Sequence, residues 1–254
     1  MKVIYKKFII LGSVLLTILV NILANALPIN GVNTGQVSDS FPVYFVPAGY
    51  AFSIWGLIYL ALLVYAIVPL LSEKLNSELI KKTFNWFVLS SSANILWIFA
   101  WHYKLIEVTV ILMLVILVSL IKIYKISVLE TQMKSLRDKM VLQFPFSLYL
   151  GWISVATIAN ITIFLYSVNW DGLGISGQTW SAILISIASI LGLIFLLKSK
   201  DVIYAGVIVW AIVAVGVKFQ EEGIILGSAI NTSIMLMSFI IITVIQKIVP
   251  KLKH

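Results

Sequence analysis

Cysteine is absent from this chain, and charged residues are scarce. Without cysteine, neither a disulfide framework nor a thiolate metal site can form. Only 11% of the residues are charged and 61% are hydrophobic, whereas a soluble globular domain is about one-quarter charged and about half apolar. The composition therefore argues against a water-soluble fold and indicates an integral membrane protein.

Residues for acid–base chemistry and metal binding are also few. His102 and His254 are the only histidines, and the sequence has no HExxH motif, glycine-rich phosphate loop or nucleophile elbow. Glu107 lies at the edge of an apolar segment, and Glu221 with Glu222 ends another. We therefore expect no metal site, no required cofactor and no buried acid–base pair, and we interpret His102 as a structural residue rather than a haem ligand.

Long apolar segments recur along the whole chain and leave no room for a separate soluble domain. Each is long enough to cross a bilayer as a helix. The first follows basic residues as a signal peptide would, but its apolar run is too long and "ANALPING" is a weak cleavage site, so we interpret it as an anchor. We expect eight spans, at about residues 8–27, 47–71, 84–103, 105–126, 144–167, 180–198, 202–219 and 224–248.

The net charge of +8 follows the topology of these spans. With the N-terminus in the cytoplasm, the inner segments contain sixteen of the eighteen basic residues, and only Lys104 and Lys218 lie outside. Lys and Arg set the orientation of membrane proteins, whereas Asp and Glu contribute little. We therefore expect both termini in the cytoplasm, and membrane lipid rather than nucleic acid as the partner of the basic residues.

Tryptophan and asparagine share helical faces in several of the expected spans. Phe52, Trp55 and Tyr59 are spaced three and then four residues apart, which places them on one face of a helix. The same three- and four-residue spacing predicts two further helical faces, each with an Asn and at least one Trp. The first span contributes a further Asn. These residues are Asn94, Trp97 and Trp101; Trp152, Ala156 and Asn160; and Asn21.

Each of these residues has a structural explanation when taken alone. An Asn inside a span usually hydrogen-bonds another helix, and a Trp near a span end usually anchors it at the interface. However, Trp55, Trp97 and Trp152 are not confined to span ends, and Asn accompanies two of them. A cavity walled by Trp with a few amides suits a flat, largely apolar ligand.

Three segments resemble motifs of the tryptophan-rich sensory protein / translocator protein (TspO/MBR) family. "PAGYAFSIWGLIY" is similar to the second-helix signature, although the family's doubled proline is single and its aromatic is shifted to Phe52. "ANILWIFAW" resembles the third-helix motif, and "YLGWISVATIAN" resembles the fifth-helix motif. The matching positions are Pro47, Trp55 and Tyr59; Asn94 and Trp97; and Tyr149, Trp152, Ala156, Thr157 and Asn160.

The resemblance implies an all-α integral membrane protein of about eight transmembrane helices. Residues 1–169 would form a five-helix ligand-binding bundle, and residues 170–254 would add three helices and a short cytoplasmic tail, as in extended bacterial and archaeal members. The implied location is a prokaryotic plasma membrane. The implied ligand is a porphyrin, a haem-like tetrapyrrole or, in some members, a sterol. We expect these ligand-binding residues: Asn21, Pro47, Phe52, Trp55, Tyr59, Asn94, Trp97, Trp101, Tyr149, Trp152, Ala156 and Asn160.

We interpret the chain as a membrane receptor, sensor or transport-associated protein that binds a porphyrin-like or other flat apolar ligand. The cavity should open outward between the first, second, third and fifth spans, with the long loop 28–46 as its cover, and Trp180 should contribute little to it. The alternatives are a light-dependent porphyrin-degrading enzyme with Trp55 and Trp152 facing the ligand, a small-molecule transporter, and a scaffold whose tryptophans only pack. The sequence leaves open whether two chains pair as a homodimer.

Overall fold

The computed structural model describes residues 2–27, 29–71, 77–131 and 135–248. All regular secondary structure within these ranges is helical, as the all-α expectation requires. The long helices are α1 (Val3–Ala26), α3 (Ile54–Leu71), α4 (Ser77–His102), α5 (Ile106–Thr131), α7 (Phe144–Ser167), α8 (Gly177–Ser199), α9 (Val202–Lys218) and α10 (Gly223–Ile248). The short ones are α2 (Thr34–Asp39), α6 (Leu136–Leu142) and the 3-10 turns η1 (Ile29–Gly31), η2 (Gly49–Ser53) and η3 (Gly172–Gly174).

The eight long helices lie where the eight spans are expected. The largest differences are at the starts of α3, which begins at Ile54 rather than at 47, and of α4, which begins at Ser77 rather than at 84. The two short helices α2 and α6 lie in segments expected to be loops. Local capping rather than apolar periodicity defines α2, because Asn33 and Gln36 form a reciprocal capping box.

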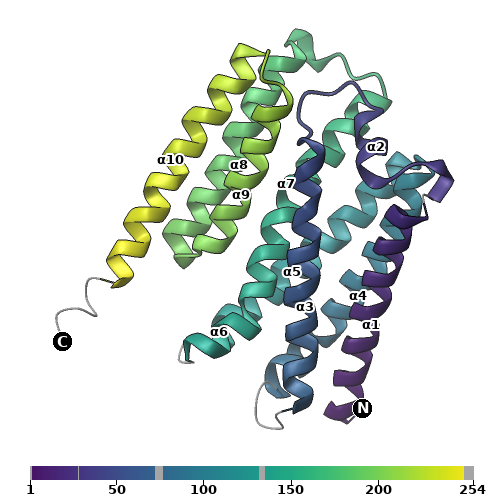
Figure 1. Cartoon of the computed structure of the whole chain (residues 1–254), viewed down its shortest axis with the longest axis vertical. Coiled ribbons are helices and arrows are strands. Elements are labelled where there is room, and N and C mark those ends of the chain that lie inside the picture. The colour runs from purple at the N-terminus through teal and green to yellow at the C-terminus, as the bar shows by residue number, and fades with distance from the viewer. Residues whose placement is uncertain (1, 28, 72–76, 132–134, 249–254) are drawn as a thin grey trace. The chain divides into compact units, whose positions relative to one another are not determined.

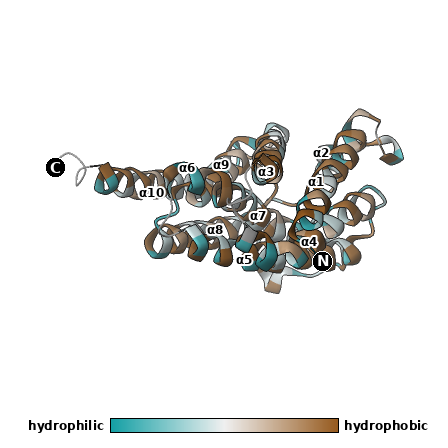
Figure 2. Cartoon of the chain, turned by 90° about the horizontal axis from the view of Figure 1, so that it is seen from below, coloured by the Kyte–Doolittle hydropathy of each residue, from teal (hydrophilic) through white to brown (hydrophobic). Residues whose placement is uncertain are grey.

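Most of the long helices have the length and surface of membrane spans. Six described helices are long and apolar enough to cross a bilayer: α1, α3 with η2, α5, α7, α8 and α10. Helix α9 is apolar but has 17 residues, and α4 begins with a charged turn. Large side chains such as Ile230, Ile234 and Ile241 on α10 are about half exposed, and Figure 2 shows that hydrophobic residues cover much of the helices. Such a surface suits lipid rather than water, so the chain is an integral membrane protein.

The chain folds as two compact units. Unit 1 comprises residues Met1–Ser40 and Phe52–Ile153, and unit 2 comprises Phe41–Ala51 and Ser154–His254. Helix α7 contributes its first part to unit 1 and its second part to unit 2. This grouping follows contacts rather than function, so the functional boundary at residue 169 stays a prediction. The topology also stays a prediction, and four of its basic residues lie outside the described ranges: Lys74, Lys134, Lys251 and Lys253.

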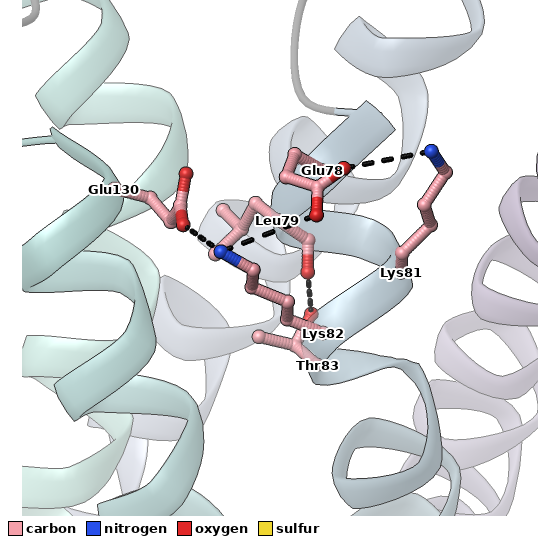
Figure 3. A network of polar contacts seen from close by, with 6 residues as sticks. All are labelled: Glu78, Leu79, Lys81, Lys82, Thr83 and Glu130. Carbon is pink, nitrogen blue, oxygen red and sulfur yellow. Dashed lines mark hydrogen bonds and ion pairs between the residues drawn. The ribbon is translucent and has the colours of Figure 1, made fainter.

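Unit 1 is built around α4. This helix packs against α1, α2 and α5, and α1 also packs against α3 (Figure 1). Tyr65, Phe87 and Phe146 form an aromatic core from α3, α4 and α7, with ring centroids 4.7 Å apart for Tyr65–Phe146 and 5.6 Å for Tyr65–Phe87. At the start of α4, Lys82 Nζ lies 2.6 Å from Glu130 Oε1 on α5 (Figure 3).

Unit 2 is a group of three helices with one added segment. Helices α8, α9 and α10 pack against one another (Figure 1). Asp201 caps α9 by accepting hydrogen bonds from the backbone N–H groups of residues 203 and 204. The segment 41–51 is held on α9, because Ala48 N donates to Ala214 O at 3.0 Å and Trp210 Nε1 donates to Ala51 O at 3.2 Å.

Candidate functional site

An amide relay joins three helices of unit 1. Asn21 Nδ2 on α1 donates to Asn94 Oδ1 on α4 at 2.9 Å, and Asn94 Nδ2 donates to the Tyr149 hydroxyl on α7 at 2.9 Å. All three side chains are buried. A polar group in a low-dielectric interior requires such a partner, so the relay fixes how these helices meet. The sequence predicted the residues but not which of them pair.

An aromatic cluster lies beside the relay. The Trp55 and Tyr59 rings stack with centroids 5.4 Å apart, and Tyr149 and Trp152 meet Trp55 edge-on at 5.6 and 6.3 Å. Phe52 meets Trp152 edge-on at 5.8 Å. Trp152 is only 3% exposed, whereas Phe52, Trp55 and Tyr59 are partly exposed. The cluster is therefore a fixed aromatic platform, held from behind by buried rings.

The helical face predicted for α4 holds the segment that follows α1. Trp97 and Trp101 stack with centroids 5.0 Å apart, and Trp101 Nε1 donates to Thr34 O at 3.1 Å. Asn30 Nδ2 donates to His102 O at 3.1 Å. Asn30 and Thr34, which follow α1, are therefore attached to the end of α4. His102 is fully buried, and its Nδ1 lies 2.7 Å from Ile98 O.

A small cavity lies beside Tyr59 of the platform and Tyr149 of the relay. Thr17, Tyr59, Ser90 and Tyr149 contribute to its lining. Its volume of about 10 Å³ is close to the minimum that one water molecule needs. Within the described residues, the buried Tyr59 hydroxyl has no hydrogen-bond partner, so one water here would satisfy it. This cavity cannot hold a tetrapyrrole, and the larger cavity expected beneath 28–46 stays a prediction.

The twelve predicted site residues divide between the two units. Nine belong to unit 1: Asn21, Phe52, Trp55, Tyr59, Asn94, Trp97, Trp101, Tyr149 and Trp152. The other three, Pro47, Ala156 and Asn160, belong to unit 2. Pro47 and Asn160 are buried there, and Ala156 is partly exposed. The structure therefore brings together the relay and the platform within unit 1, whereas the ligand-binding role of all twelve residues stays a prediction.

Unit 2 contains a pocket that sequence reasoning missed. Its volume is about 500 Å³, and its lining includes Tyr44, Tyr166, Trp170 and Trp180. Trp170 and Trp180 flank a glycine-rich turn near span ends, a position that is typical of interfacial aromatics. The available signal was that pair of tryptophans on either side of Gly172 and Gly177, but no periodicity links them to α7 or to the 41–51 segment.

Comparison with known families decides the relationship of the chain. A family model described as TSPO-like protein matches residues 7–246. The chain belongs to this family. The TSPO-like match runs through α8, α9 and α10, beyond the residues 1–169 that carry the motif resemblance, so the last three helices are part of the family pattern. Searches of curated proteins and of solved structures found no match.

Proposed function

We propose that this TSPO-like chain is a membrane receptor or sensor that binds a flat, largely apolar ligand of the tetrapyrrole class at the aromatic platform of unit 1. One observation carries the proposal. Trp55 and Phe52 keep part of their rings exposed while buried Trp152 and Tyr149 hold them edge-on. Rigid aromatic rings bind a flat ligand at low entropic cost, because they lose little freedom on binding.

The relay supports this role by fixing the platform. Asn94 accepts from α1 and donates to Tyr149, whose ring meets Trp55 edge-on. A ligand that stacks on Trp55 therefore contacts a surface whose position three helices determine. The bilayer concentrates apolar molecules around such a site, so modest intrinsic affinity is enough for a sensor.

The location is part of the proposal. The positive-inside distribution of Lys and Arg supports cytoplasmic N- and C-termini. The resemblance to extended bacterial and archaeal members supports a prokaryotic plasma membrane. A reporter fused after the last residue should therefore be active on the cytoplasmic side, and activity on the outer side would contradict this topology.

Titration of the full chain with protoporphyrin tests the binding proposal. The protein is placed in lipid nanodiscs, with empty nanodiscs as the background, and saturable quenching of tryptophan fluorescence is measured. Trp55→Ala should lower the affinity about two- to tenfold, because one aromatic contact is lost. Trp86→Ala is the matched control, since Trp86 on α4 is also partly exposed and belongs to neither the relay nor the platform. Equal losses for the two variants would contradict a site at the platform.

The same preparation separates the alternative functions. Quenching without a light-dependent product favours a binder, whereas a product that requires both light and Trp55 or Trp152 favours the enzyme. Uptake of protoporphyrin into sealed vesicles favours the transporter. Absence of any saturable quenching favours the scaffold, in which the tryptophans only pack.

A further inference from the structure

The pocket of unit 2 has the size and construction of a small-molecule site. Its volume of about 500 Å³ lies within the range of ligand pockets, about 300–1,000 Å³. The segment 42–45, the second half of α7, the turn that contains η3 and the first turns of α8 line it. All of these elements belong to unit 2, and none contributes to the amide relay or to the aromatic platform.

The Tyr44 wall of this pocket is fixed before any ligand arrives. Ser181 Oγ donates to Tyr44 O at 2.8 Å, and Gln178 Nε2 donates to the Tyr44 hydroxyl at 3.2 Å. Gly177 allows the Tyr44 ring to approach α8, because a Cβ at this position would lie 2.8 Å from the ring. The Tyr44 ring also packs on Phe219 with centroids 5.4 Å apart.

The tryptophan wall is fixed in the same way. Trp180 Nε1 donates to Gly172 O at 2.8 Å, and the Trp170 and Trp180 rings lie 5.2 Å apart. Gly172 has φ +67° and a Cβ here would lie 3.3 Å from the indole nitrogen, so a side chain at this position would be strained and crowded. Because the indole N–H is already bonded to the backbone, the Trp180 ring offers its apolar surface to the pocket.

The charge of the pocket limits which ligand it accepts. Asp171 is the single charged residue in its described lining, which contains no Lys, Arg or His. Asp171 is exposed, and its Oδ1 accepts from Leu173 N at 2.9 Å. The hydroxyl-bearing side chains Thr162 and Tyr166 also line the pocket, and Tyr166 is 47% exposed. An anionic group would meet a carboxylate here, and the described lining holds no cation to offset the repulsion.

We infer that this pocket is a second ligand site, for a ring-containing apolar molecule that is uncharged or positively charged and carries one hydroxyl or amine. The ring lies among Trp180, Leu165 and Leu184, and the polar group lies toward Asp171 and Tyr166. The turn after α7 and the paired tryptophans place the polar end near the membrane boundary, where such amphipathic rings are found. A carboxylated tetrapyrrole is an anion, which this pocket disfavours. The pocket is therefore a different site from the one proposed in unit 1.

Three anthracene probes of nearly the same shape test the charge preference. Anthracenemethanol is uncharged, aminomethylanthracene is a cation, and anthracenecarboxylic acid is an anion at neutral pH. Each probe is titrated into nanodiscs that contain the full chain, and its anthracene fluorescence is measured. The fluorescence of the same probe with empty nanodiscs is subtracted. The alcohol and the amine should bind saturably, and the acid should bind more weakly. Saturable binding of the acid at the affinity of the amine, or signals no larger than partition into empty nanodiscs, would overturn the proposal.

A cavity-filling variant locates the binding. Leu184→Trp places a large side chain in the pocket without removing a hydrogen bond, and it should abolish saturable binding of the alcohol and the amine. Leu197→Trp is the control on the same helix, because Leu197 is 61% exposed and does not line the pocket. Equal binding by the two variants would place the probes elsewhere. Protoporphyrin quenching should be the same in both, which separates this test from that of unit 1.

Asp171→Asn tests the charge without filling the pocket. The new amide keeps an oxygen that can accept from Leu173 N, so the turn is preserved. The amine should lose about two- to fivefold in affinity, the acid should gain, and the alcohol should be unchanged. Unchanged binding of both charged probes would show that Asp171 does not face the ligand. Because this variant is nearly isosteric, it decides the matter if Leu184→Trp fails to fold.

Discussion

Units 1 and 2 both contain tryptophan and other aromatic residues, but the surroundings of these rings differ. In unit 1, Trp152 is almost completely buried against Trp55 and Phe52, and the cavity nearby is about 10 Å³. In unit 2, Trp170 and Trp180 stand at a pocket of about 500 Å³. The difference lies in what borders the rings. In unit 1, other aromatic side chains fill the space on their buried side, whereas in unit 2 the rings border an open pocket.

This difference separates aromatic content from room for a ligand. Edge-on and stacked rings fill space efficiently, so a tryptophan-rich helical face can be a packed wall. In unit 2, hydrogen bonds fix the rings that border the pocket. Trp180 on α8 donates to the backbone carbonyl of Gly172 in η3, and Tyr44 is held by Ser181 and Gln178. Both rings are therefore held in place by hydrogen bonds, and two of the partners, Gly172 and Ser181, also line the pocket.

The largest effect expected is on the stability of unit 1. Trp152→Ala should lower the free energy of unfolding by about 3–5 kcal/mol, because a large buried side chain is removed from a packed cluster. Trp180→Ala should cost about 1–2 kcal/mol, mainly through its one hydrogen bond. Thermal unfolding of both variants in the same detergent measures the difference. Equal losses of stability in the two variants would contradict the distinction between a packed cluster in unit 1 and an open pocket in unit 2.

The relay should give the next largest effect. Asn94→Ala removes the bonds to Asn21 and Tyr149 and should lower the free energy of unfolding by about 1–3 kcal/mol, because buried polar groups lose their partners. Asn85→Ala is the control, since Asn85 is exposed on the same helix, and it should change stability by less than about 0.5 kcal/mol. A double-mutant cycle with Tyr149→Phe should show coupling, and strict additivity of the two changes would argue against the relay.

Unit 2 should prove tightly packed away from its pocket. A Cβ at Gly216 on α9 would lie 2.8 Å from the Cβ of Ala229 on α10. Gly216→Ala should therefore lower the free energy of unfolding by about 1 kcal/mol. This is a net value, because the higher helix propensity of Ala offsets part of the cost of the clash. Gly206 on the same helix has open space, so Gly206→Ala should stabilise by up to about 1 kcal/mol. If both changes stabilised the protein, the crossing of α9 and α10 would be looser than the structure shows.

The smallest effect should come from the ion pair at the start of α4. Glu130 raises the pKa of Lys82, first through their hydrogen bond and then through its charge, and Lys82 precedes the expected span 84–103. The pair therefore stabilises fully below the ordinary lysine value of 10.5, and its contribution is lost as pH rises through the raised pKa. Glu130→Gln should reduce stability slightly at neutral pH and low salt, and less at high salt. A loss that is independent of salt would indicate a role other than charge pairing.

The sequence by itself predicted most of the helical framework and the family. Apolar length placed the eight long helices, because a span must satisfy its own backbone within one segment. Three- and four-residue spacing grouped Phe52 with Trp55 and Tyr59 and Asn94 with Trp97 and Trp101, and the motifs that they carry gave the TSPO-like relationship that the family model confirms. The sequence did not predict the short helices α2 and α6, because so few residues do not establish an apolar periodicity.

The tertiary structure decided which of these residues pair and where space remains. Asn21 and Asn94 are 73 positions apart, Lys82 and Glu130 are 48 apart, and Tyr44 and Ser181 are 137 apart. Periodicity describes one helix at a time, so it cannot identify partners at such separations. Periodicity also cannot tell whether other side chains cover an aromatic ring or whether the ring borders a pocket. The volume beside a ring depends on side chains from distant parts of the chain.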